Sequence, residues 1–237
     1  MKQPKAADVA FVGLAFLLAL GVKAFYSRAG ASELAFILAP SCWLAAHLGR
    51  IDLVAAQGAG YISHAYRMVV GPACAGMNFL IISFLAVLLS RRMAGVRDGI
   101  GGLLIAIVAA YAATILTNAL RIILAAHLFQ LGGAGWLTPE RIHRLAGVVI
   151  YCVAVVTLCR ALTPGGRSLI VPLACYVAVA IGLPLFNGAA RNPVFVEHAL
   201  VVTAVSLLVL AVARAAATRP KPPAAPRPPP ASPVSIG

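Results

Sequence analysis

The chain alternates long apolar stretches with short polar segments. Each of seven apolar stretches approaches the about 20 residues that a helix needs to cross a bilayer core. Lipid offers backbone groups no hydrogen-bond partner, so such stretches form helices, and weak two-residue alternation argues against a β-barrel. The pattern therefore predicts an all-α, polytopic transmembrane helical bundle. Its seven predicted spans are residues 9–26, 31–48, 74–90, 100–120, 145–163, 168–186 and 196–214.

Two polar segments interrupt this pattern. Residues 49–72 are too polar for an easy span, and we expect an interfacial hairpin or a re-entrant piece there; if they cross, the chain has eight spans. Residues 121–144 begin amphipathic, pass through a glycine-rich break and restart at Thr138. Thr138 is typical of a helix N-cap and is followed by Pro139 at the first helical position. The sequence leaves the choice between seven and eight spans open.

Composition predicts a membrane-embedded chain with a polar extension. Of the 237 residues, 62% are hydrophobic and 11% are charged, whereas soluble domains contain about 45–50% apolar and about 25% charged residues. We expect residues 1–214 to form a single integral membrane domain. Residues 215–237 are rich in proline and alanine and cannot build a core, which predicts a disordered cytoplasmic tail.

Basic residues predict the orientation and the surroundings of the chain. The formal net charge is +13, and no nucleic-acid-binding motif accompanies it, so we expect contact with membrane lipids and no nucleic acid. Arginines fill the loops after the third, fifth and seventh predicted spans. These loops share one side if the spans alternate, and that side is predicted to be cytoplasmic. Seven spans then put the N-terminus outside, although Lys2 and Lys5 favour the inside.

Alternation of the spans brings three reactive side chains to the extracytoplasmic face. Cys74 begins the third span, Arg121 follows the fourth and His143 precedes the fifth. Alone, each has an ordinary explanation, namely packing, lipid anchoring and an interfacial position. Together they suit thiol-based acyl transfer, which needs a thiolate nucleophile, a group that takes and returns a proton near neutral pH and a cation for the oxyanion.

Neighbouring residues extend this candidate site. Asn118 lies one helical turn before Arg121 on the same face. Ala75 and Gly76 leave room for a substrate backbone beside the thiol. The other four cysteines are expected to pack as small hydrophobes, and no metal or organic cofactor is expected because no Cys/His cluster has metal-site spacing. His127 is expected at the interface, and His47 and His64, which lie before the cysteine motif, are not expected to touch substrate. The acidic residues that could orient the catalytic histidine are Asp52, Glu140 and Glu197.

The motifs around these residues resemble those of the exosortase/archaeosortase family of membrane transpeptidases. GPACAGMNF at 71–79 is similar to the Cys-(Ser/Ala)-Gly signature, NALR at 118–121 to the Asn-x-x-Arg element and HRLAG at 143–147 to the His-x-x-x-Gly element. The resemblance covers about residues 30–165 and is closest to the small exosortase K group. In that family a polar extracytoplasmic segment precedes the cysteine, which favours seven spans here.

The resemblance implies a cysteine protease and transpeptidase in the bacterial inner membrane, with a catalytic core at about residues 49–165 that faces the extracytoplasmic side. Its substrates would be exported proteins with a C-terminal sorting signal, made of a PEP-like motif, a transmembrane helix and a basic cluster. The acyl group would pass to an envelope acceptor, such as an amine or a lipid headgroup. By the motifs, Cys74 is the nucleophile, His143 the general base and acid, Arg121 the oxyanion or thiolate stabiliser, and Asn118 its orienting neighbour.

Two other classes of protein also fit the sequence. A small-solute transporter would line its pathway with Arg and His, since ionisable groups inside membranes mark such paths; the lack of inverted repeats and of mid-helix charges argues against it. In a structural membrane subunit, the same residues would only anchor helix ends. Replacing Cys74 discriminates these classes, because only the transpeptidase needs its thiol.

Overall fold

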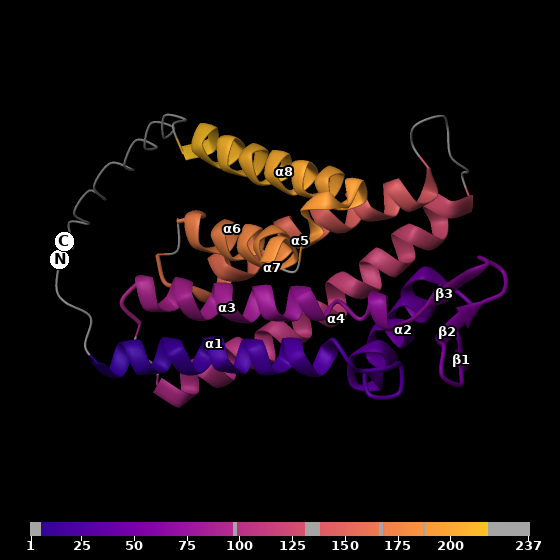
Figure 1. The fold of residues 1–237 in the computed structure, drawn as a ribbon, viewed down its shortest axis with the longest axis horizontal. Coiled ribbons are helices and arrows are strands. Elements are labelled where there is room, and N and C mark those ends of the chain that lie inside the picture. The colour runs from indigo at the N-terminus through magenta and orange to yellow at the C-terminus, as the bar shows by residue number, and fades with distance from the viewer. Residues whose placement is uncertain (1–5, 97–98, 131–137, 166–167, 187, 218–237) are drawn as a thin grey trace, which may run out of the picture.

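The structure is a computed structural model that describes residues 6–96, 99–130, 138–165, 168–186 and 188–217 (Figure 1). These residues are mostly helical, as predicted. The longer helices are α1 (Ala6–Tyr26), α2 (Ala35–Gly49), α3 (Met77–Met93), α4 (Gly99–Gln130), α5 (Pro139–Leu162) and α8 (Pro193–Ala217). Between α5 and α8, α6 (Ile170–Val177), the π-helical segment η2 (Ala178–Gly182) and α7 (Leu183–Phe186) form one continuous helix, followed by the 3₁₀ turn η3 (Ala189–Arg191).

Five helical segments among the described residues are long and apolar enough to cross a membrane, which indicates a membrane protein. They are Val9–Tyr26, Pro72–Met93, Gly99–Gln130, Arg141–Leu162 and Pro193–Ala215. The other two predicted spans form shorter apolar helices, Ala35–Gly49 and Ile170–Phe186. At about 1.5 Å per residue, the first of these is about 22 Å long, less than the about 30 Å of a bilayer core. Length therefore supports five of the seven predicted spans.

Helix α3 lies at the centre of the bundle. It packs against α1, α4, α5 and α6, and α5, α6 and α8 lie on one side of it in Figure 1, with α1 on the other. Its buried residues include Phe79, Ile82 and Leu85, which belong to the larger of two apolar clusters. A second cluster, formed by residues such as Ile37, Leu38 and Ile122, fills the end of the bundle near α2.

The polar segment 49–72 folds into a small sheet. The chain was predicted to be all-α, and this segment is the exception among the described residues. The strands β1 (Val54–Ala56), β2 (Gly60–Ser63) and β3 (Met68–Val70) pair antiparallel in that order. The sheet lies at one end of the molecule beside α2 (Figure 1). In β3, Met68 and Val70 are buried and Val69 is exposed, the alternation of a half-buried strand. The runs are too short for this pattern to stand out in the sequence.

Two predicted helix boundaries near the candidate site are wrong. Helix α4 continues to Gln130, beyond the predicted end at residue 120, because Ile122, Ala125 and Ala126 extend its buried face. Helix α3 begins at Met77, not at residue 74, and is preceded by the 3₁₀ turn η1 (Pro72–Cys74).

The predicted start of α5 is confirmed. Thr138 is its N-cap, and the side-chain oxygen accepts a hydrogen bond from the Arg141 backbone N–H at 3.4 Å. The tail predicted at residues 215–237 lies largely outside the described residues, since α8 includes residues 215–217.

Candidate active site

Two of the three predicted reactive side chains are in direct contact. Arg121 lies inside α4 and His143 in the first turns of α5, and Arg121 Nη2 is 2.9 Å from His143 Nε2. The second guanidinium nitrogen, Nη1, donates to the Tyr151 hydroxyl at 3.0 Å. The guanidinium is therefore held between two side chains of α5, spaced by two helical turns.

The contact between Arg121 and His143 defines the tautomer of the imidazole. A guanidinium carries five N–H donors and no acceptor, so Nε2 of His143 accepts and the ring proton lies on Nδ1. Nδ1 is buried and has no hydrogen-bond partner among the described residues. The lone pair that a general base would use is thus occupied by Arg121 in this arrangement.

Asn118 connects this pair to the cysteine. Its amide Nδ2 donates to the backbone carbonyl of Cys74 at 2.5 Å, and its Oδ1 accepts from the Tyr151 hydroxyl at 3.2 Å. Asn118 is fully buried, where an unpaired amide would be costly. A continuous hydrogen-bonded network therefore runs from the Cys74 carbonyl through Asn118, Tyr151 and Arg121 to His143.

The thiol of Cys74 is not part of the network. Cys74 is half-buried and packs against the second apolar cluster, on the side of α2. Within the described part of the chain, its sulfur hydrogen-bonds neither Arg121 nor His143. The network therefore joins the arginine, the histidine and the backbone of the cysteine, whereas the thiol makes no hydrogen bond to its predicted partners among the described residues.

Two glycines allow the three helices to approach. Gly76 caps α3 with φ +70°, a left-handed conformation that favours glycine. A Cβ atom there would lie 3.2 Å from Thr114 and 3.3 Å from the Tyr151 hydroxyl. On α5, a Cβ atom at Gly147 would lie 3.1 Å from Arg121 Nε. Ala75, expected to leave room for substrate, is fully buried instead.

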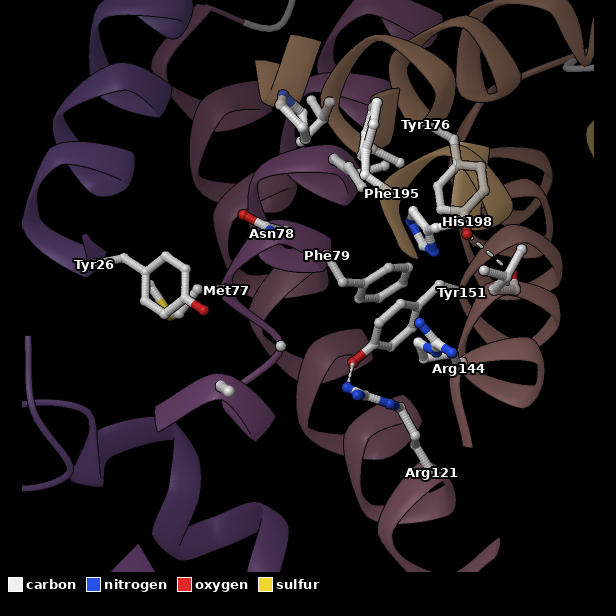
Figure 2. A pocket seen from close by; sticks show the side chains of 18 residues that line it. Tyr26, Met77, Asn78, Phe79, Arg121, Arg144, Tyr151, Tyr176, Phe195 and His198 are labelled. Atoms are coloured by element: carbon white, nitrogen blue, oxygen red, sulfur yellow. Dashed lines mark hydrogen bonds between the residues drawn. The ribbon is translucent and has the colours of Figure 1, made fainter. Parts of the chain in front are cut away.

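A cavity of about 270 Å³ adjoins the network (Figure 2). Its wall includes Gly76, Arg121 and Tyr151 of the network. Figure 2 shows the rings of Phe79 and Tyr151 side by side, stacked with centroids 4.6 Å apart and planes inclined by 16°. The remaining lining residues come from α1, α3, α5, the α6–α7 helix and α8, and include Tyr26, Asn78, Arg144, Tyr176, Phe195 and His198.

The polar side chains that line this cavity carry no carboxylate among the described residues. Arg121 and Arg144 both reach it, from neighbouring helices. Glu197, which does not line the cavity, pairs with Arg141 at 3.3 Å and with Arg144 at 3.8 Å, and all three side chains are about one-third exposed. On the α1 side, Lys23 donates to Asn78 Oδ1 at 3.0 Å. The cavity is therefore lined by apolar and cationic groups.

None of the predicted acidic partners of His143 occupies that role among the described side chains. Glu197 binds the two arginines. Asp52 lies by the sheet, where it accepts from the Ser63 hydroxyl and the Ala65 N–H. These hydrogen bonds, chiefly that of Ser63, lower the pKa of the Asp52 carboxyl. The side chain of the third candidate, Glu140, lies outside the described residues.

His127, His47 and His64 lie apart from the network, whereas His198 lines the adjoining cavity. His127 is exposed and meets Tyr66 edge-on, with centroids 5.7 Å apart. His47 bonds the Trp43 carbonyl through Nδ1 at 2.7 Å. His64 is exposed beside the sheet. Across the described ranges, no three His, Cys, Asp or Glu side chains gather as a metal site would require.

Tyr151 is the member of the network that the sequence analysis missed. It follows His143 and Gly147 at intervals of four residues, so all three share one face of α5. That spacing was the available signal, since a polar side chain on the same face as a candidate histidine is expected to reach the same neighbours. No protein-family model, curated protein or solved structure matches this chain.

Proposed function

We propose that this protein is a membrane cysteine protease and transpeptidase of exosortase type. The observation that carries the proposal is the network in which Arg121 binds His143 and, through Tyr151 and Asn118, the backbone of Cys74. Three segments far apart in the sequence contribute, and they are the three that carry the family-like motifs. An adjoining cavity lined by Arg121 and Tyr151 offers space for a substrate beside the network.

In the proposed reaction, Cys74 attacks the carbonyl carbon of the scissile peptide bond. Its Sγ–H proton passes to Nε2 of His143 as the S–C bond forms, and the C=O electrons move to the oxygen, where Arg121 stabilises the oxyanion. When the C–N bond breaks, His143 returns the proton to the departing amine and a thioester remains. An amine acceptor, or water, then attacks the thioester carbon. As the new C–N or C–O bond forms and the C–S bond breaks, a proton of the acceptor passes through His143 to the departing sulfur.

The proposed substrate and location follow from the resemblance of the motifs to those of the exosortase family. The substrate is an exported protein whose C-terminal sorting signal combines a short motif, a transmembrane helix and a basic cluster. The chain lies in the bacterial inner membrane with this site on the extracytoplasmic side, and α2 and the α6–α7 helix complete seven spans. The cationic and apolar lining of the cavity supports a substrate that approaches from the membrane interface.

Processing of a tagged substrate tests the proposal. Cells that carry the wild-type chain should convert the substrate to a shorter, membrane-released or acceptor-linked form. Cys74→Ala, Arg121→Ala and His143→Ala should abolish this conversion at equal protein levels. Cys159→Ala is the matched control, because Cys159 is a buried cysteine of the larger apolar cluster, whereas Cys74 packs against the second one. Normal processing by Cys74→Ala rules the proposal out.

A further inference from the structure

We propose that Tyr151 is the positioning residue that holds Arg121 while its guanidinium exchanges the His143 ring for the oxyanion of the substrate. The inference rests on the proposed function and assigns a role that none of the predicted catalytic residues can fill. Its basis is the geometry around one hydroxyl group, which accepts from Arg121 Nη1 at 3.0 Å and donates to Asn118 Oδ1 at 3.2 Å.

Arg121 must change its hydrogen-bond partner before His143 can act as a base. Its Nε2 lone pair accepts from Arg121 Nη2 at 2.9 Å, so it cannot take the Cys74 proton while that contact persists. The other ring nitrogen, Nδ1, carries the proton and is a donor, so it cannot accept a proton as a base would. The arrangement is therefore a resting one, and the nitrogen becomes available only when Nη2 finds another acceptor. The oxygen of a bound carbonyl is such an acceptor, and it becomes stronger as it turns into an oxyanion.

Tyr151 can hold the guanidinium in both arrangements. Its bond uses Nη1, whereas the exchange involves Nη2, so the first bond persists as the second changes partner. The ring cannot easily move, since it stacks on Phe79 of the central helix with centroids 4.6 Å apart. The phenol, Phe79 and the guanidinium lie together in Figure 2. Because stacking fixes the Tyr151 ring, its hydroxyl can hold the Arg121 guanidinium while Nη2 leaves His143, binds the oxyanion and returns.

The same hydroxyl also orients Asn118. Because Oδ1 of Asn118 accepts from Tyr151, its Nδ2 points toward the Cys74 carbonyl, to which it donates at 2.5 Å. Loss of the hydroxyl would leave Oδ1 buried without a donor and would permit the amide to rotate. The Tyr151 hydroxyl thus positions the Arg121 guanidinium directly and the Cys74 backbone through Asn118.

Two glycines support a role for this geometry beyond simple packing. Gly147 leaves space for Arg121 Nε, and Gly76 leaves space for the Tyr151 hydroxyl. Any side chain at either position would press on the arginine or on the hydroxyl that holds it. The backbone of α3 and of α5 is therefore shaped around this pair of side chains.

The test is Tyr151→Phe in the purified full-length chain, measured by cleavage of a tagged substrate in liposomes. Phenylalanine keeps the stacking on Phe79 and removes only the hydroxyl. We expect kcat to fall about 10- to 100-fold, the effect of losing one hydrogen bond to a charged group, with KM within about threefold of wild type. A merely structural tyrosine would instead lower thermal stability and leave kcat of the folded fraction unchanged.

Tyr111→Phe is the matched control. Tyr111 lies on α4 outside the lining of this cavity, and its hydroxyl donates to the Phe36 carbonyl at 2.6 Å. We expect this variant to keep wild-type kcat. If Tyr151→Phe fails to accumulate, Gly147→Ala perturbs the other partner of the same hydrogen bond, because its Cβ would press on Arg121 Nε while Tyr151 stays intact. It too should lower kcat, and an unchanged kcat overturns the inference.

The outcomes separate the two proposals. Normal cleavage by Cys74→Ala overturns the proposed function and this inference with it. An inactive Cys74→Ala together with a fully active Tyr151→Phe overturns the inference alone, and so does an equal loss of kcat in Tyr151→Phe and Tyr111→Phe. An inactive Cys74→Ala with a selective loss of kcat in Tyr151→Phe supports both.

Discussion

Replacing Arg121 with lysine keeps the positive charge and removes the planar pair of donors. Arg121 binds two partners at once, the Tyr151 hydroxyl at 3.0 Å and His143 Nε2 at 2.9 Å. A lysine ammonium is a single point of charge, so it can reach one of these partners but cannot bridge both as the guanidinium does. The variant therefore forfeits at least one hydrogen bond to a charged donor.

The magnitude follows from two terms. One such hydrogen bond is worth about 1.5–3 kcal/mol, which corresponds to about a 10- to 150-fold change in rate. Misplacing a donor that stabilises an oxyanion costs about 100- to 1000-fold in kcat. These terms overlap, since the same guanidinium supplies both, so we expect kcat/KM of Arg121→Lys to fall by about 100- to 1000-fold.

The assay is the initial rate of substrate cleavage by purified protein in liposomes, with single-turnover measurements to isolate thioester formation. Arg160→Lys is the control, because Arg160 is an exposed arginine at the far end of α5, and it should retain wild-type kcat/KM. A thermal unfolding midpoint verifies that each variant is folded. If folded Arg121→Lys cleaves within about threefold of wild type, the two-donor role of Arg121 is refuted.

Three further variants test the fold around the site. Gly76→Ala should lower the free energy of unfolding by about 1–2 kcal/mol, because alanine disfavours the left-handed conformation at φ +70° and would crowd two neighbouring helices; Gly21→Ala in α1, with nothing within 4 Å of the added carbon, should not lower it. Thermal melts of both variants give the comparison. Asp52→Asn tests pH dependence: the Asp52 pKa lies below its usual value because of the Ser63 hydroxyl, so its stabilisation is present above about pH 4 and disappears as pH falls through the lowered pKa. Melts from about pH 7 to about pH 3 should decline less for Asp52→Asn than for wild type, and equal declines contradict this assignment. Thr138→Ala removes the N-cap of α5 and should cost about 0.5–1 kcal/mol, read as a lower unfolding midpoint; an unchanged midpoint would show that the cap contributes nothing.

The small sheet shows where the sequence was least informative. Its strands contain three or four residues each, too few for alternation to be distinguished from a polar loop. What fixes them is tertiary: Gly60 brings its backbone so close to the Val70 carbonyl that a Cβ atom would lie 2.3 Å from that oxygen. The sequence predicted an interfacial hairpin or a re-entrant piece at residues 49–72 and left open whether it crosses, but it did not predict the three strands.

Within the candidate site, Arg121 and His143 are in contact, while Asn118, predicted to orient Arg121, bonds the Cys74 carbonyl and Tyr151 instead. The contact between Arg121 and His143 is a consequence of helix geometry, since α4 extends past Arg121 and α5 begins at Pro139, so both side chains occur on facing helical surfaces. Helix boundaries were the weak point, because apolar residues such as Ile122 continue a buried face through a segment whose average polarity suggested a break.

The sequence by itself determined that the chain is helical, apolar and suited to a membrane, because hydrophobic runs of the required length leave no other way to satisfy the backbone. It also determined which reactive residue types the chain carries. Only the tertiary structure decided how they connect: that Tyr151 joins Arg121 to Asn118, that Asn118 binds the carbonyl of Cys74 and not its thiol, and that the His143 lone pair is engaged. Hydrogen bonds depend on directions and on tenths of an ångström, and these follow from the packing of three helices around two glycines, which no local pattern encodes.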